Sequence, residues 1–188
     1  MIMKKIIIII LLLKYASLAY CISSSDMEGM VEDFCKTEDK YEFISDYHSS
    51  VRLSKSESID FVFMALDRLL DNPQKPDLKY AWKISKLSNF IDKLDPDTIP
   101  LRHVATLFKA LRIGGIMLTG DIIFIDLLDK IVGNNPGYTM KYLESGNFTN
   151  ETRIELINQW EKIFEENKEN ILKKRYYKSK YFGKSVAD

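Results

Sequence analysis

Apolar side chains recur at intervals of three and four residues along most of this chain. That spacing places them on one face of a helix. Six well-defined apolar stripes cover residues 27–35, 59–70, 78–94, 101–111, 122–132 and 150–171, and shorter ones lie around 41–51 and 138–144. We therefore predict an all-α fold of about seven or eight helices.

Polar residues mark several helix ends. Ser25 with Glu28, and Ser54 with Glu57, have the spacing of a capping box, in which each side chain binds the other residue's backbone N–H. The stripe after Glu57 stops before Pro73, because the residue ahead of a proline disfavours helical dihedrals. These signals place boundaries that agree with the apolar stripes.

We predict that the helices form a single irregular bundle, with a short stack of helical pairs as the alternative. The stack is suggested by a weak internal repeat, since the Phe-Ile-Asp of Phe90–Asp92 recurs as Phe124–Asp126. The dense Ile/Phe run from Ile122 to Leu128 also fits a buried strand, although Asp121, Asp126 and Asp129 suit a helix with one polar edge.

The N-terminus has the three parts of a secretory signal peptide. Two lysines precede an unbroken Ile/Leu run from Ile6 to Leu13, and Ser17 and Ala19 provide a small-x-small exit. The apolar run is shorter than the roughly 20 residues that span a bilayer. We expect residues 1–19 to be removed, with cleavage after Cys21 as the alternative, and the mature chain to be secreted without an integral membrane span.

The two cysteines depend on that cleavage site. Cleavage after Ala19 leaves Cys21 and Cys35 in the product, where an oxidising compartment could close a disulfide between them. Cleavage after Cys21 leaves Cys35 alone. The predicted globular domain, residues 22–172, is in either case long enough to bury a hydrophobic core of its own.

Charge divides the chain into an acidic body and a basic tail. The whole chain has 27 basic and 27 acidic residues, yet the last sixteen carry six basic side chains and one acidic one. We treat residues 173–188 as a separate tail in which cations alternate with aromatic rings: Lys173, Lys174, Arg175, Tyr176, Tyr177, Lys178, Lys180, Tyr181, Phe182 and Lys184.

Three interpretations of this tail remain open. Its cations and rings suit an acidic protein surface or an anionic lipid, whereas a nucleic-acid partner is not expected. In a secretory precursor, the basic run ending at Arg175 would be a processing site that releases a C-terminal peptide. The tail could also be a solvated end without a function.

Candidate catalytic residues are few. His48 and His103 lie in separate predicted helices without a metal-ligand spacing, and His103 follows Arg102 in a first turn, which favours a solvated or capping role. Asp126 and Asp129 share a helical face but are more typical of a polar helix edge. We therefore predict a protein that is not an enzyme and binds no cofactor or metal.

Two adjacent N-glycosylation sequons begin at Asn147 and Asn150 in a predicted polar loop. They suit a chain that enters the secretory route. Asn150 could instead cap the following helix.

These observations favour a secreted helical protein that acts by binding a protein partner, in the manner of an extracellular effector. A carrier of a small apolar ligand is the main alternative, because residues 113–132 could line a cavity between helices as readily as fill a core.

Overall fold

Helices are the only regular secondary structure in the part of the chain that the computed structural model describes. It describes residues 23–36, 53–71, 78–113, 118–138 and 149–182. The α-helices are α2 (Ser24–Lys36), α4 (Lys55–Asp71), α5 (Leu78–Ile91), α6 (Val104–Ile113), α7 (Leu118–Ile131) and α9 (Asn150–Phe182), and the short 3-10 helices are η1 (Pro96–Thr98) and η2 (Leu101–His103). The all-α prediction is confirmed. The predicted helices around 41–51 and 138–144 lie outside the described residues, apart from Tyr138.

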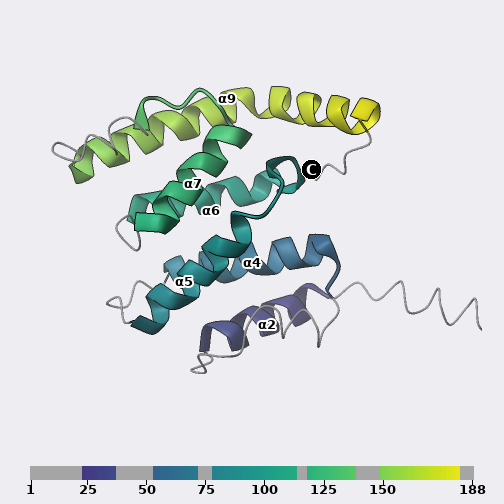
Figure 1. The fold of residues 1–188 in the computed structure, drawn as a ribbon, viewed down its shortest axis with the longest axis vertical. Helices are drawn as coiled ribbons and strands as arrows, with labels where there is room; N and C mark the ends of the chain where they lie inside the picture. Colours follow the sequence, from purple (N-terminus) through teal and green to yellow (C-terminus); the bar gives the residue numbers. More distant parts are fainter. Residues whose placement is uncertain (1–22, 37–52, 72–77, 114–117, 139–148, 183–188) are drawn as a thin grey trace, which may run out of the picture.

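The helices are layered (Figure 1). Consecutive helices α4 and α5 pack against each other, as do α6 and α7, while α4 also contacts α6 and α5 contacts α7. Helix α2 covers α4 at one end of the stack, and α9 lies across α6 at the other. The four central helices are thus arranged as two stacked helical pairs. The Phe-Ile-Asp repeat starts near the end of α5 but in the middle of α7, so it does not mark a repeated structural unit.

One continuous core joins these layers. Among its largest buried side chains are Phe61 and Phe63 of α4, Phe108 of α6 and Trp160 of α9. The Ile/Phe run that also suited a strand lies inside α7, where Phe124, Ile125, Leu127, Leu128 and Ile131 are buried at helical spacing. The strand alternative is therefore wrong.

The two predicted capping boxes have different outcomes. At α4 the backbone N–H of Ser54 donates to Glu57 Oε2 at 2.7 Å, and that of Glu57 donates to Ser54 Oγ at 3.2 Å, so this box is confirmed. Helix α2 begins earlier than predicted. There Ser23 Oγ accepts from the backbone N–H of Asp26 at 3.2 Å, which gives the same spacing two residues upstream of Ser25.

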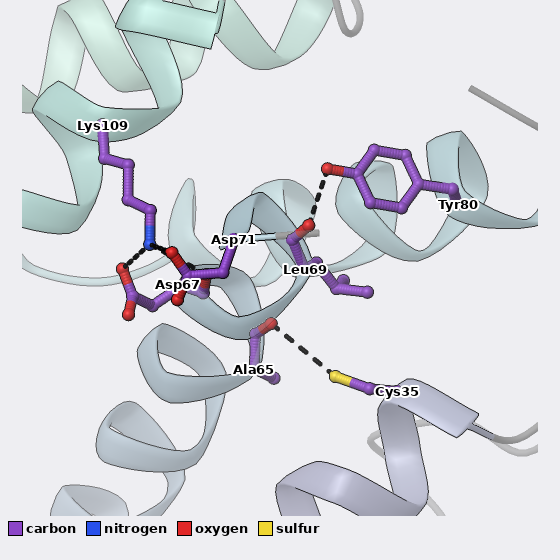
Figure 2. Close-up of polar contacts among 7 residues, drawn as sticks. All are labelled: Cys35, Ala65, Asp67, Leu69, Asp71, Tyr80 and Lys109. Carbon is purple, nitrogen blue, oxygen red and sulfur yellow. Dashed lines mark hydrogen bonds and ion pairs between the residues drawn. The ribbon is translucent and has the colours of Figure 1, made fainter. Parts of the chain in front are cut away.

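Helix α4 is tied to three neighbours through the carboxyl-terminal half of its length (Figure 2). Tyr80 Oη of α5 donates to the carbonyl of Leu69 at 2.8 Å, and Cys35 Sγ of α2 lies 3.9 Å from the carbonyl of Ala65. Lys109 Nζ of α6 binds Asp67 Oδ1 at 2.8 Å and Asp71 Oδ1 at 2.7 Å. These polar contacts add direction to the apolar packing of α2, α5 and α6 on α4.

Helix α9 is longer than the apolar stripe predicts. The stripe ends at Ile171, whereas the helix continues to Phe182, so the boundary drawn at Lys173 falls inside it. Within the described residues, no helix combines the length and the apolar character that crossing a membrane requires.

Candidate functional site

The C-terminal part of α9 is held against the segment that connects α5 to α6. Arg175 is only 3% exposed, and its Nη1 and Nη2 donate to the carbonyls of Ile99 and Pro96 at 2.6 and 2.9 Å. Burial lowers the pKa of Arg175, while the nearby carboxylates of Asp97 and Asp95 act in the opposite direction. A guanidinium stays protonated in proteins, so a buried positive charge fixes this end of the helix.

A second cation supports the same contact. Lys178 Nζ lies 2.6 Å from Asp97 Oδ2, one helical turn beyond Arg175. The side chain of Asp95 accepts from the backbone N–H of Asp97 at 3.0 Å and caps η1, which orders the segment that receives both cations. Residues 173–182 are thus part of a packed helix, because η1 provides acceptors for cations that the apolar pattern does not reveal.

This packing leaves an open groove between η2 and α9. The groove has a volume of about 510 Å³. Its walls combine two leucines, three cations and one tyrosine, namely Leu101, Leu172, Arg102, Lys168, Lys173 and Tyr176. We call it the η2–α9 groove; it pairs apolar contact surface with positive charge.

The three groove cations have only weak internal partners. Arg102 is 58% exposed and pairs with Asp60 at 2.6 Å, while Lys173 Nζ, at 75% exposure, lies 3.8 Å from Glu169. Lys168 Nζ lies 3.6 Å from Glu165 and 5.4 Å from the ring centre of Phe164. Exposed ion pairs contribute about 0–1 kcal/mol. Exchanging the partners of Lys168 and Lys173 for a bound anion therefore costs little.

A basic and aromatic stripe continues outward from the groove. Positions 173, 176, 177 and 180 lie three, four and seven residues apart and share one face of α9. Tyr176 and Tyr177 are 67% and 57% exposed, and Ile122 is the other exposed large hydrophobic residue in the described part of the chain. We call Lys173, Tyr176, Tyr177 and Lys180 the outer stripe.

The remaining predicted tail residues are placed differently. Lys174 is exposed on α9. Tyr181 and Phe182 belong to the helix, although the positions of their side chains are not described, and Lys184 lies outside the described residues. The structure therefore brings Lys173 and Tyr176 into the groove and turns Arg175 and Lys178 towards η1.

The predicted glycosylation sites are only partly described. Asn147 lies outside the described residues. Asn150 is exposed at the first position of α9, where its Oδ1 accepts from Arg153 at 2.5 Å. The capping role belongs to Thr149, whose Oγ1 accepts from the backbone N–H of Thr152 at 3.2 Å. Glycosylation of both sites stays a prediction.

The solvated role expected for His103 is wrong. Its side chain is buried, stacks on Phe63 with the ring centres 4.7 Å apart, and places Nε2 2.6 Å from Asp60 Oδ1. A carboxylate oxygen accepts only, so Nε2 carries the proton that joins them. Burial lowers the pKa of His103, and the contact with Asp60 offsets part of that effect. This pair supports η2 and, with it, the groove residues Leu101 and Arg102.

Cys35 has a protected thiol. Burial raises its pKa, and the charge of Lys83 only partly opposes that effect, so the thiol stays neutral at pH 7. Lys83 Nζ donates to the carbonyl of Cys35 at 2.6 Å. Cys21 and His48 lie outside the described residues, so the predicted disulfide stays a prediction.

Asp126 and Asp129, the two aspartates that share a helical face, are both engaged in exposed contacts. Asp126 binds Lys130 at 2.5 Å, and Asp129 accepts from Asn135 at 3.3 Å. The described ranges contain no cluster of three His, Cys, Asp or Glu side chains that could hold a metal ion. The η2–α9 groove places three cations beside two leucines, an arrangement with the chemistry to receive an anionic group next to an apolar one.

Among the groove residues, Lys173 and Tyr176 were named from the sequence, whereas Lys168, Leu172, Leu101 and Arg102 were missed. Arg102 and Leu101 come from η2, far from α9 in the chain, and no local pattern links them to it. The spacing of Lys168, Leu172 and Tyr176, four residues apart, was a usable signal for a shared face.

No known protein family, curated protein or solved structure matches this chain.

Proposed function

We propose that this protein is a secreted binding protein that engages an anionic partner through the η2–α9 groove. The observation that carries the proposal is the groove itself, with Arg102, Lys168 and Lys173 around the leucines Leu101 and Leu172. The cations attract and orient an anionic group. Burial of apolar surface against the leucines beside it further stabilises the complex. Such a surface binds without any chemical step.

The stability of the binding surface supports this role. The buried Arg175 holds the helix that provides Lys168, Lys173 and Tyr176, so these side chains are presented by a fixed backbone. A preformed surface loses less conformational entropy on binding than a flexible tail does. The groove is therefore better suited to recognition than a solvated tail of the same composition.

Secretion is proposed from the signal-peptide pattern of residues 1–19. The intact mass of the product in the medium of secreting cells tests it. We expect a mass that begins after Ala19 or Cys21, increased by glycan at Asn147 or Asn150. Retention of Met1 in an exported product would contradict this part of the proposal.

The two alternatives receive less support from the described residues. Processing after Arg175 requires that α9 unwind first, because that side chain is buried and bound to two carbonyls. Phe124 and Leu128 belong to the segment that the carrier alternative uses to line a cavity, and both are packed in the core.

Salt-dependent retention on a phosphorylated matrix tests the groove. The test variant combines Arg102→Gln, Lys168→Gln and Lys173→Gln. The control variant combines Lys36→Gln, Lys130→Gln and Lys162→Gln, which removes the same charge from exposed lysines in similar ion pairs elsewhere.

We expect the groove variant to elute at a clearly lower salt concentration than the control, because bound phosphate contacts the groove cations. Circular dichroism verifies that both variants keep the helical content of the parent. Equal elution of the two variants would show that retention follows net charge, and the groove would lose its role.

A further inference from the structure

We propose that the anionic partner is a phospholipid bilayer surface, which the outer stripe of α9 contacts while the adjacent η2–α9 groove receives an anionic headgroup. This inference rests on the proposed function and specifies the chemistry of its partner. It is based on the side chains that α9 exposes beyond the groove.

The exposed tyrosines of the outer stripe suit the interface of a bilayer. Tyr176 and Tyr177 are 67% and 57% exposed and lie side by side, between Lys173 and Lys180 on the same face. Tyrosine favours the headgroup level of a membrane, where its ring is in the apolar region and its hydroxyl in the polar one. Lysines beside such rings attract anionic lipids.

The size of the stripe points to the same partner. The eight residues from Lys173 to Lys180 form only about 12 Å of helix, whereas each side of a stable protein–protein interface buries about 800 Å². A bilayer needs no matching shape, because headgroups rearrange around the side chains that approach them. Together with Arg102 and Lys168 of the groove, the stripe presents four cations, the lower end of the basic clusters that bind anionic lipids.

Negative charges that precede the outer stripe on α9 determine which part of the helix contacts an anionic bilayer. Glu165, Glu166 and Glu169 lie on the same side of α9 before the stripe begins, and all three are exposed. They would be repelled by an anionic surface. Helix α9 therefore contacts the bilayer through its last turns rather than along its length. In Figure 1 this end of α9 (yellow) lies at the margin of the molecule, beyond the layer formed by α6 and α7.

Co-sedimentation of the secreted, processed product with vesicles tests the inference. The vesicles contain phosphatidylcholine alone or mixed with phosphatidylserine, and every variant is taken from the medium, so that the apolar run Ile6–Leu13 has been removed. We expect Lys173→Gln with Lys180→Gln to lower partitioning into the anionic vesicles about thirtyfold. The matched pair Lys130→Gln with Lys162→Gln should change it less than twofold.

The tyrosines provide an independent measurement. Tyr176→Ser with Tyr177→Ser should weaken binding to the anionic vesicles at every salt concentration, without changing how steeply binding falls with salt. The matched variant Ile122→Ser, at the other exposed large hydrophobic position of the described residues, should bind like the parent. Glu169→Gln should strengthen binding about fivefold, because it removes a repelled charge next to Lys173.

The outcomes separate this inference from the proposed function. Retention on the phosphorylated matrix without binding to anionic vesicles would overturn the bilayer inference and leave the groove as an anion site. Equal binding to soluble polyglutamate, unaffected by Tyr176→Ser with Tyr177→Ser, would indicate an acidic protein and also overturn it. Loss of matrix retention in the groove and control variants alike would overturn the proposed function itself.

Discussion

The two halves of α9 are attached to the rest of the molecule by different balances of apolar and polar contact. In the first half, Ile157, Trp160 and Phe164 are buried in the shared core. An ion pair between Arg112 of α6 and Glu161 adds to this apolar contact. In the second half, Ile171 and Leu172 are only partly buried against the core, and the buried anchor is polar: Arg175 donates to the carbonyl of Ile99, and Lys178 donates to Asp97. Apolar attachment needs a continuous apolar face on the helix. Polar attachment needs only a few cations that bind acceptors held in fixed positions.

This difference explains why one helix carries both a structural and a binding surface. Because the second half uses two cations for attachment, its remaining faces stay available for Lys173, Tyr176 and Tyr177. In the first half, the face that packs in the core is not available for a binding surface. The following predictions test this division, beginning with the largest expected effect.

Trp160→Ala should be the most damaging change. The side chain is fully buried, its Nε1 donates to the carbonyl of Gly133 at 3.1 Å, and its ring meets Phe108. We expect the free energy of unfolding to fall by about 3–5 kcal/mol, measured by urea unfolding. The exposed neighbour Lys162→Ala should change it by less than about 0.5 kcal/mol. A similar loss in both variants would contradict apolar attachment of the first half.

Arg175→Met should detach the second half selectively. The carbonyls of Ile99 and Pro96 would lose their donor, at a cost of about 1–3 kcal/mol. Hydrogen exchange should show lost protection at residues 168–182 and retained protection at 150–164. The exposed neighbour Lys174→Met is the control, and uniform deprotection of α9 by Arg175→Met would show that the two halves are not independent.

The ion pair between Lys178 and Asp97 should contribute less. The two side chains are 36% and 17% exposed, so water partly screens the pair; fully exposed pairs contribute about 0.2–1 kcal/mol. A double-mutant cycle with Lys178→Ala and Asp97→Ala measures their coupling. We expect the coupling to decrease as salt is added; coupling independent of salt would mean that the contact acts through packing.

The smallest effect should come from His103, which supports η2 opposite the second half of α9. Its folded-state pKa lies below the ordinary value of 6.5, so the unfolded chain binds more protons as the pH falls through that value. Stability should therefore decrease below about pH 6.5 and return as the pH rises. The effect is small because Asp60 offsets part of the burial penalty.

His103→Gln tests this expectation, because an amide N–H can still donate to Asp60 without titrating. Unfolding curves between pH 5 and pH 8, about the range in which histidine titrates, should show a flatter profile for this variant than for the parent. An unchanged profile would assign the pH dependence to other groups.

The fold could be predicted from the sequence better than the site. The core half of α9 depends on apolar side chains that recur along the chain, whereas the site depends on polar contacts that do not. Ile157, Trp160 and Phe164 recur at helical spacing, so the core half of the helix could be recognised without coordinates. Arg175 lies in a segment whose composition is typical of a solvated tail, and no neighbouring residue in the chain indicates that its side chain is buried. His103 was misjudged similarly, because its partners Asp60 and Phe63 belong to another helix.

Apolar periodicity by itself determined the all-α class of the described residues and where most of their helices lie, because each stripe reflects a local repeat of 3.6 residues. The tertiary structure decided that the basic segment is a packed helix, since the carbonyl that binds Arg175 lies 76 residues away in the chain. It likewise decided that η2 and α9 share a groove. Long-range polar contacts have no period along the chain, so only the folded arrangement brings their partners together.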